Sequence, residues 1–295
     1  MHTRHSRAQS AMEYLSTYGW AILIIAVVLV ALFSLGAFNG LAFAPRAPPG
    51  SCTVYRPYGP WSVDLIVLQG LCNVDLPQYV GVFSAANSYV NIGSVSQLEV
   101  PSTLTVSAWV NGNPSQTNTN PSLVDKGGNC CNVGYGLFLH NTGSNFNVYA
   151  RVHASSATTL LSTGSFSYST WNFVAMTYDG SYVSIYINGA FDKQASNSGG
   201  ISYGSYNSII GADSALSEDF DGMISNVQIY NASLSANEIQ SLYAEGIGGA
   251  PLRLQNLAGW WPLNGNTNDT SGNNANAISS DLSFTSSWTS GYSTP

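Results

Sequence analysis

The chain has 295 residues, of which only 8% are charged, and its formal net charge is −7. Fifteen acidic residues against eight basic ones repel a phosphate backbone, so we expect no nucleic acid partner. Few charges together with 29 glycines and 17 tyrosines are typical of a β-rich extracellular domain and argue against a helical cytosolic enzyme.

An almost uninterrupted apolar segment runs from Trp20 to Phe38. At about 1.5 Å per residue it spans about 28 Å, close to the hydrocarbon thickness of a bilayer. Arg4 and Arg7 precede it, which predicts a single-pass membrane helix with its N-terminus inside and the rest of the chain outside. A cleaved secretory signal is the alternative, but Pro45 directly follows the small residues at which cleavage would occur.

The residues before this segment carry a resemblance. The stretch Arg7-Ala8-Gln9-Ser10-Ala11-Met12-Glu13-Tyr14-Leu15, followed by Tyr18-Gly19-Trp20, resembles the N-terminus of archaeal type IV pilin-like proteins with a class III signal peptide. The resemblance implies a leader at 1–8, cleavage between Ala8 and Gln9, and a retained hydrophobic helix at 9–38.

In pilins the carboxylate at the position of Glu13 pairs with the free amine of a neighbouring subunit, so the resemblance also implies self-assembly through the helix. A local role is the alternative, because Ser10 and Glu13 have the spacing of a helix capping box. Whether the helix anchors one molecule or packs with its copies in a filament stays open.

Beyond the helix we expect a Pro/Gly-rich stalk at 39–60 and a small disulfide-tied collar at 61–78. Four cysteines permit three pairings. We favour Cys52–Cys72, which closes a loop of about twenty residues worth about 3 kcal/mol. The adjacent Cys130 and Cys131 either form a strained ring or stay reduced, and a zinc site is the weaker alternative.

From Tyr79 onward the sequence predicts many short strands broken by Gly, Asn and Asp. The pairs Asp179-Gly180 and Asn188-Gly189 favour tight hairpin turns, so three consecutive antiparallel strands are expected around them. In the middle strand, Tyr186 lies on the face opposite to the core and is expected to be wet or covered by polar neighbours. The expected strands are Ser88–Ile92, Leu104–Val110, Tyr135–His140, Phe146–Val152, Asn172–Tyr178, Val183–Asn188, Ser208–Gly211 and Met223–Tyr230.

One helix is predicted near the end of the chain. Ser235 and Glu238 form a capping box, Ile239 and Leu242 give a short apolar stripe, and Gly246 is placed to end the helix. Many antiparallel strands with one short helix indicate an all-β sandwich.

The β-rich region resembles the laminin G-like, or concanavalin A-like, jelly-roll domain over roughly 79–245, and we expect the domain to extend over 79–295. The stretches that carry the resemblance are Leu104-Thr105-Val106-Ser107-Ala108-Trp109-Val110, Trp171-Asn172-Phe173-Val174-Ala175-Met176-Thr177-Tyr178-Asp179-Gly180 and Phe220-Asp221-Gly222-Met223-Ile224-Ser225-Asn226-Val227-Gln228-Ile229-Tyr230. In this family a Trp-Pro-Leu strand usually comes first, whereas Trp261-Pro262-Leu263 comes last here. We therefore expect a circularly permuted jelly roll, and a truncated second domain is the rival.

The resemblance implies carbohydrate or protein binding, often with calcium, and in some relatives glycan hydrolysis. We expect no enzyme, because the acid-x-acid-x-x-acid strand of the glucanases is missing. The aromatic candidates for ligand binding are Tyr182, Tyr186, Tyr203 and Tyr206. The candidates for calcium are Asp125, Asp213, Asp219, Asp221 and Asp269, each of which could instead stabilise a turn.

These expectations combine into a membrane-anchored cell-surface adhesin: a pilin-like helix, a stalk and one jelly-roll domain displayed outside the cell. The alternative is a structural filament subunit whose sandwich makes subunit contacts and binds no ligand.

Overall fold

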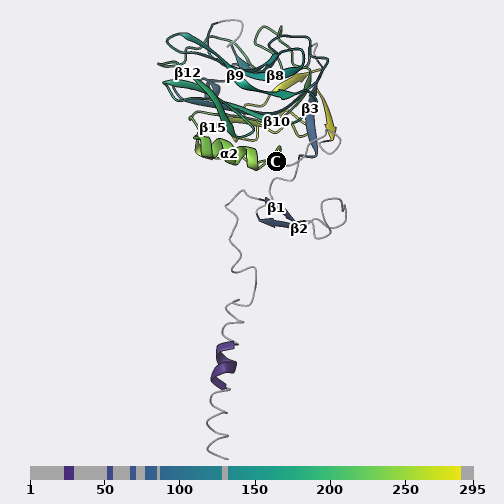
Figure 1. The fold of residues 1–295 in the computed structure, drawn as a ribbon, viewed down its shortest axis with the longest axis vertical. Helices are drawn as coiled ribbons and strands as arrows, with labels where there is room; N and C mark the ends of the chain where they lie inside the picture. The colour runs from purple at the N-terminus through teal and green to yellow at the C-terminus, as the bar shows by residue number, and fades with distance from the viewer. Residues whose placement is uncertain are drawn as a thin grey trace, which may run out of the picture. The chain divides into compact units, whose positions relative to one another are not determined.

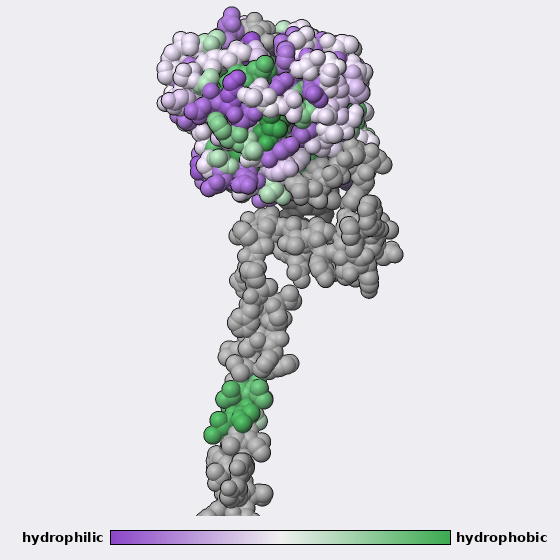
Figure 2. Space-filling view, viewed as in Figure 1, coloured by the Kyte–Doolittle hydropathy of each residue, from purple (hydrophilic) through white to green (hydrophobic). Residues whose placement is uncertain are grey.

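The structure is a computed structural model that describes residues 23–29, 77–84, 87–127 and 132–286, together with the backbone of two strands at 52–55 and 67–70. The chain divides into two units, Met1–Pro48 and Pro49–Pro295. In the first unit, residues 23–29 are helical, and their apolar side chains are exposed (Figure 2). Among the described residues no helix is long and apolar enough to cross a membrane. The rest of the helix predicted at 9–38, with Ala8, Gln9 and Glu13, lies outside these ranges.

The predicted stalk and collar are described only at a short hairpin. Strand β1 (Cys52–Tyr55) pairs antiparallel with β2 (Val67–Gly70), which places the backbone of Cys52 opposite Gly70. Cys72, Cys130, Cys131 and the side chain of Cys52 lie outside the described residues, so the disulfide pairings stay predictions.

The main domain is a sandwich of two antiparallel sheets (Figure 1). In the described part of the chain the eight-stranded sheet has the order β12-β11-β10-β5-β14-β3-β17, with β15 also pairing β14. Its strands are β3 (Tyr79–Phe83), β5 (Leu104–Gly112), β10 (Asn172–Tyr178), β11 (Tyr182–Ile187), β12 (Ala190–Ser196), β14 (Gly222–Tyr230), β15 (Leu257–Trp261) and β17 (Ser283–Ser286).

The second, seven-stranded sheet has the order β16-β4-β13-β6-β7-β8-β9. Its strands are β4 (Tyr89–Gly93), β6 (Ser122–Lys126), β7 (Tyr135–Asn141), β8 (Asn145–His153), β9 (Ala157–Ser167), β13 (Ser208–Ile210) and β16 (Ile278–Ser280), and two short 3-10 helices, η1 (Ser96–Leu98) and η2 (Leu254–Asn256), lie in the connections. These two sheets confirm the all-β antiparallel sandwich that the strand pattern predicted.

The main core lies between the sheets and follows the period-two alternation of the strands. In β8, every second residue from Phe146 to Val152 is fully buried and belongs to this core. In β4, Val90 and Ile92 point inward in the same way, while Asn91 points outward and is only partly buried.

The predicted hairpins are confirmed. Strand β11 pairs with both β10 and β12, and Gly180, Asn188 and Gly189 have φ values of 91°, 50° and 76° in the two turns. The expectation for Tyr186 was wrong, because its ring is buried in a second apolar cluster rather than wet or under polar neighbours.

That second cluster lies under helix α2 (Ala236–Ala244), which packs on the outer face of the eight-stranded sheet (Figure 1). Trp109 of β5 stacks on Tyr243 of the helix with ring centroids 5.7 Å apart. The predicted capping box is present: Ser235 accepts a hydrogen bond from the N–H of Glu238, and the Glu238 carboxylate accepts one from the N–H of Ser235.

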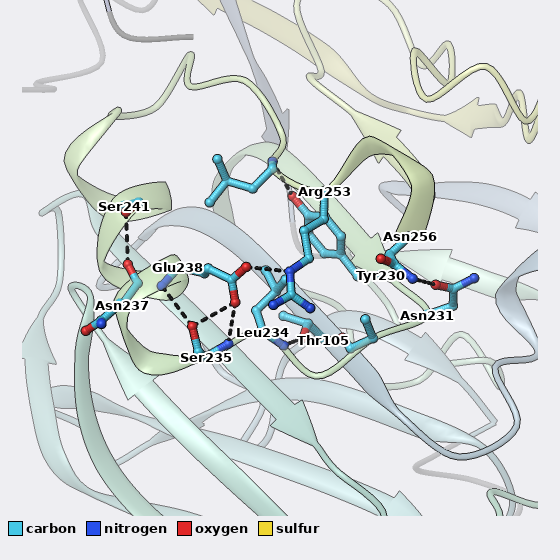
Figure 3. A network of polar contacts seen from close by, with 12 residues as sticks. Thr105, Tyr230, Asn231, Leu234, Ser235, Asn237, Glu238, Ser241, Arg253 and Asn256 are labelled. Atoms are coloured by element: carbon cyan, nitrogen blue, oxygen red, sulfur yellow. Dashed lines mark hydrogen bonds and ion pairs between the residues drawn. The ribbon is translucent and has the colours of Figure 1, made fainter. Parts of the chain in front are cut away.

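Polar contacts hold the chain on both sides of this helix (Figure 3). Arg253, beyond the helix, pairs with Glu238, and Thr105 of β5 accepts a hydrogen bond from the N–H of Leu234 at 2.9 Å. The Tyr230 hydroxyl accepts a hydrogen bond from the N–H of Leu252 at 3.1 Å. Helix α2 therefore covers part of the outer face of the eight-stranded sheet, while Tyr182 of the same sheet stays exposed.

The C-terminal segment supplies strands to both sheets. Strand β15 pairs with β14, with Trp260 opposite Gln228 and Trp261 opposite Val227, and Trp261 and Leu263 are fully buried in the main core. Strand β16 pairs with β4, and β17 pairs with β3. The neighbouring positions that a circular permutation requires are thus present, and these strands complete the one sandwich.

Candidate functional site

The outer face of the seven-stranded sheet carries a half-open pocket of about 220 Å³. Among the residues that the structure describes, no helix covers this pocket, whereas α2 packs on the opposite face of the sandwich. It is lined by residues of β4, β13 and two loops: Asn91, Ser205, Tyr206, Asn207, Ile209, Ser214 and Leu216. We call this cavity the sheet pocket.

The floor of the sheet pocket follows from strand register. Ile209 of β13 lies directly opposite Asn91 of β4, so the two side chains emerge on the same face. Their neighbours Val90 and Ile210 are fully buried between the sheets, which fixes Asn91 and Ile209 on the outer face. The side-chain oxygen of Asn91, Oδ1, accepts a hydrogen bond from the N–H of Gly93 at 2.9 Å. The side-chain N–H₂ of Asn91 is then the group that can donate to a ligand.

The aromatic wall is Tyr206, in the loop between β12 and β13. The buried Lys126 ammonium donates a hydrogen bond to the Tyr206 carbonyl at 2.6 Å and pairs with Glu99 at 3.2 Å. Tyr206 also lies against two glycines, because a Cβ at Gly127 or Gly204 would come within 3.2 and 2.9 Å of its ring. The loop is therefore anchored, while 38% of the Tyr206 side chain stays exposed.

The opposite loop is held by Asp125 on β6. Its carboxylate, fully buried, accepts hydrogen bonds from the N–H and the hydroxyl of Ser214 at 2.8 and 2.6 Å. The Ser214 hydroxyl in turn accepts one from the N–H of Gly127. Asp125 thus positions one wall of the sheet pocket, and its Oδ2 atom accepts hydrogen bonds from Ser214 and Gly127.

The lining of the sheet pocket contains amides, hydroxyls, one aromatic ring and two aliphatic side chains, and none of these groups is charged. A site of this composition offers hydrogen bonds to hydroxyl groups and an apolar surface to a ring. It gives a charged ligand no opposite charge to pair with. The geometry therefore favours a small, neutral, hydroxylated ligand.

The four tyrosines proposed from the sequence lie in different environments. Tyr206 is part of the sheet pocket, and Tyr182 is exposed on β11 of the other sheet. Tyr186 is buried under α2, and the Tyr203 hydroxyl donates to the carbonyl of Val100 at 2.8 Å. Burial raises the pKa of Tyr203 well above its ordinary value. Of the four tyrosines, Tyr206 is the one that lines the sheet pocket.

Two of the remaining aspartates stabilise turns. One oxygen of Asp269 accepts from the N–H groups of Trp260 and Ser271, and the other from the N–H of Ala275. Asp213 is buried and accepts from the N–H groups of Ser217 and Glu218 at 2.7 and 3.3 Å. These bonds are the turn-stabilising alternative that the sequence left open.

The last two candidates for calcium, Asp219 and Asp221, lie at one end of the sandwich. The Asp221 carboxylate accepts from the Ser115 hydroxyl and the Asn113 amide. The Asp219 Oδ1 atom is buried without a hydrogen-bond partner, and burial raises the pKa of Asp219 above its ordinary value. Within the described ranges no three His, Cys, Asp or Glu side chains gather to hold a metal ion. Among the five candidate aspartates, Asp219 is the one whose carboxylate has a buried oxygen without a hydrogen-bond partner.

Sequence reasoning missed most of the sheet pocket. Asn91, Asn207 and Ile209 carry no motif, and Leu216 is an isolated leucine in a polar loop. Their meeting depends on pairing between strands that are more than a hundred residues apart. The local signal was the alternation of apolar Val90, polar Asn91 and apolar Ile92 along one strand, which indicates that Asn91 faces away from the core.

Comparisons with known proteins agree with this fold. A search of curated proteins found no match. Among solved structures, a candidate carbohydrate-binding protein of Bacteroides ovatus ATCC 8483 has a TM-score of 0.55 at 18% identity, covering 71% of this chain and 60% of its own. The SAP-like pentraxin of Limulus polyphemus has a TM-score of 0.50 at 13% identity, covering 74% and 100%. At these identities the likeness shows the fold alone.

The chain therefore spans 60% of the length of the Bacteroides ovatus protein. The family model of the concanavalin A-like lectin/glucanases superfamily matches residues 84–240, which is more than half of the 295 residues. The Trp261-Pro262-Leu263 segment lies outside the matched range, and the circular permutation stays a prediction. By this match the chain belongs to the concanavalin A-like lectin/glucanases superfamily.

Proposed function

We propose that this domain is a carbohydrate-binding module whose ligand occupies the sheet pocket. The observation that carries the proposal is one exposed tyrosine ring held beside amides and hydroxyls in an uncharged cavity. An aromatic face packs on the C–H face of a sugar ring, while the amides bond its hydroxyls. Membership of a superfamily that includes lectins supports the same proposal.

A glycan array with the full-length chain tests this function. We expect binding of neutral glycans, lost in Tyr206→Ala, because the aromatic wall is removed. Tyr182→Ala is the matched control, since Tyr182 has a similar exposure, 44% against 38%, but lies on the other sheet. Equal binding by both variants would move the site away from the sheet pocket, and a silent array would favour the purely structural alternative.

We propose further that the domain is displayed at a cell surface by the N-terminal helix, as an adhesin. The apolar run and its likeness to archaeal type IV pilin-like proteins support this. Mass spectrometry of the mature N-terminus decides the processing: a chain that begins at Gln9 supports it, and one that keeps Met1 contradicts it. Sedimentation of the mature protein separates a single anchored molecule from the alternative, a filament subunit.

The proposed role is binding rather than catalysis, and calcium is a proposed accessory at Asp219. The array is therefore run with and without calcium, on wild type and Asp219→Asn. A calcium-dependent signal that the variant loses would place the ion there. A calcium response that persists in the variant would exclude that position. Release of reducing ends from any bound glycan would contradict the proposed absence of hydrolysis.

A further inference from the structure

Leu216, on the rim of the sheet pocket, has an unusual backbone. Its φ is 58°, in the left-handed region that a branched, non-glycine residue rarely adopts. Such strain persists only where the surroundings impose it, and it concentrates at functional sites. Leu216 therefore needs a physical explanation.

Burial does not supply that explanation. Leu263 has nearly the same φ, 56°, but its side chain is fully buried in the main core, so packing compensates for the strain. The Leu216 side chain is 44% exposed. Burial of the side chain therefore does not compensate for the backbone strain at Leu216 as it does at Leu263.

The turn around Leu216 imposes its conformation. The N–H of Leu216 donates to the Asp213 carbonyl at 2.9 Å, and the next N–H, of Ser217, donates to the Asp213 carboxylate at 2.7 Å. Asp213 is itself buried, so the turn cannot relax without exposing it. The leucine side chain is thereby presented to the sheet pocket, whose other apolar contacts are Tyr206 and Ile209.

We infer that Leu216 is a specificity-determining residue that selects neutral sugars carrying a methyl group, as an N-acetyl or 6-deoxy substituent does. This inference rests on the proposed carbohydrate binding. A methyl group is the one apolar projection of such a sugar, and an exposed aliphatic side chain at the rim removes it from water. The uncharged lining excludes acidic sugars from the same position.

The test measures affinity and stability together on the full-length chain. Calorimetric titrations compare N-acetylglucosamine with glucose, and L-fucose with L-galactose. In the wild type we expect the methyl-bearing sugar of each pair to bind about tenfold more tightly, the usual gain for one small apolar group. Leu216→Gly brings this ratio near one and raises Tm by about 2 °C, because glycine relieves the left-handed strain.

Two further variants separate the loss of the leucine contact from the relief of backbone strain. Leu216→Ala removes the contact but keeps a Cβ at positive φ, so it lowers the ratio without raising Tm. Asn274→Gly changes an exposed residue with φ of 59° outside the pocket, and it leaves the ratio unchanged.

Failure of this inference is distinguishable from failure of the proposed function. A tenfold ratio that survives in Leu216→Gly, with binding still abolished by Tyr206→Ala, overturns the role of Leu216 alone. A lower Tm in Leu216→Gly overturns the strain argument. If no sugar binds, and Tyr206→Ala behaves as wild type, the proposed function fails and this inference fails with it.

Discussion

The two outer faces of the sandwich differ in what covers them. Helix α2 packs on the outer face of the eight-stranded sheet and covers an apolar cluster there, and hydrogen bonds from Leu234 to Thr105 and from Leu252 to Tyr230 hold the chain beside it. On the face of the seven-stranded sheet the described part of the chain places no helix, and two anchored loops leave a small cavity there. One outer face thus carries a packed helix, and the other carries the cavity in which we propose that a ligand binds.

The same kinds of residue take opposite roles on the two faces. Tyr186 and Tyr206 are both tyrosines outside the main core, yet the first is buried under a helix and the second forms a pocket wall. Residue type does not decide between these roles; what is packed above the residue does. Substitutions on the covered face should therefore change mainly stability, and substitutions on the open face should also change ligand binding.

The covered face is tested by Ile239→Ala in α2. Ile239 is fully buried against the eight-stranded sheet, so its truncation leaves a cavity and lowers the free energy of unfolding by about 2–4 kcal/mol. Urea denaturation measures this loss. Leu254→Ala, at a residue that is 68% exposed, is the control and should change stability by less than about 0.5 kcal/mol. Sugar affinity of the folded variant should stay unchanged, and a parallel loss would show that the faces are coupled.

The open face is tested by Lys126→Met, which removes the donor to the Tyr206 carbonyl and the partner of Glu99. We expect a loss of about 1–3 kcal/mol in the free energy of unfolding because the Tyr206 carbonyl loses its charged donor, together with weaker sugar binding because Tyr206 loses its anchor. Denaturation and calorimetric titration give the two values. Lys193→Met, on exposed β12, should alter neither. If sugar binding survives in Lys126→Met, the contacts with Gly127 and Gly204 are enough to position the Tyr206 ring.

The smallest effect concerns Glu245, at the end of α2. Burial raises its pKa to about 7, and its Oε2 atom lacks a hydrogen-bond partner. A raised carboxyl pKa stabilises the fold below the ordinary pKa, and this contribution is lost as pH rises toward 7. Since Glu245 is partly exposed, we expect Glu245→Gln to be about 1 kcal/mol more stable than wild type at pH 8 and equal to it at pH 4.

Thermal unfolding between pH 4 and pH 8 measures the difference. A constant offset between the two proteins across this range would contradict the titration of Glu245 and would indicate a packing effect instead.

Much of the fold could be predicted because its signals are local. The Asp-Gly and Asn-Gly turns determined β10 to β12, and the capping box determined α2. Strand β9 was not predicted, because its serines and threonines give it few buried apolar positions. The cover over Tyr186 could not be predicted either, since the period of a strand says which face a residue occupies and not what lies on that face.

The sequence by itself determined the class of this protein: a β-sandwich of short strands with one capped helix, because turn chemistry and alternation act between near neighbours. The sheet pocket was decided only by the tertiary structure. Asn91, Tyr206 and Leu216 meet through strand register, a buried lysine and a turn held by Asp213. The turn is local, but the strand register and the bond from Lys126 to Tyr206 join residues that are 80 or more positions apart, and no local pattern encodes them.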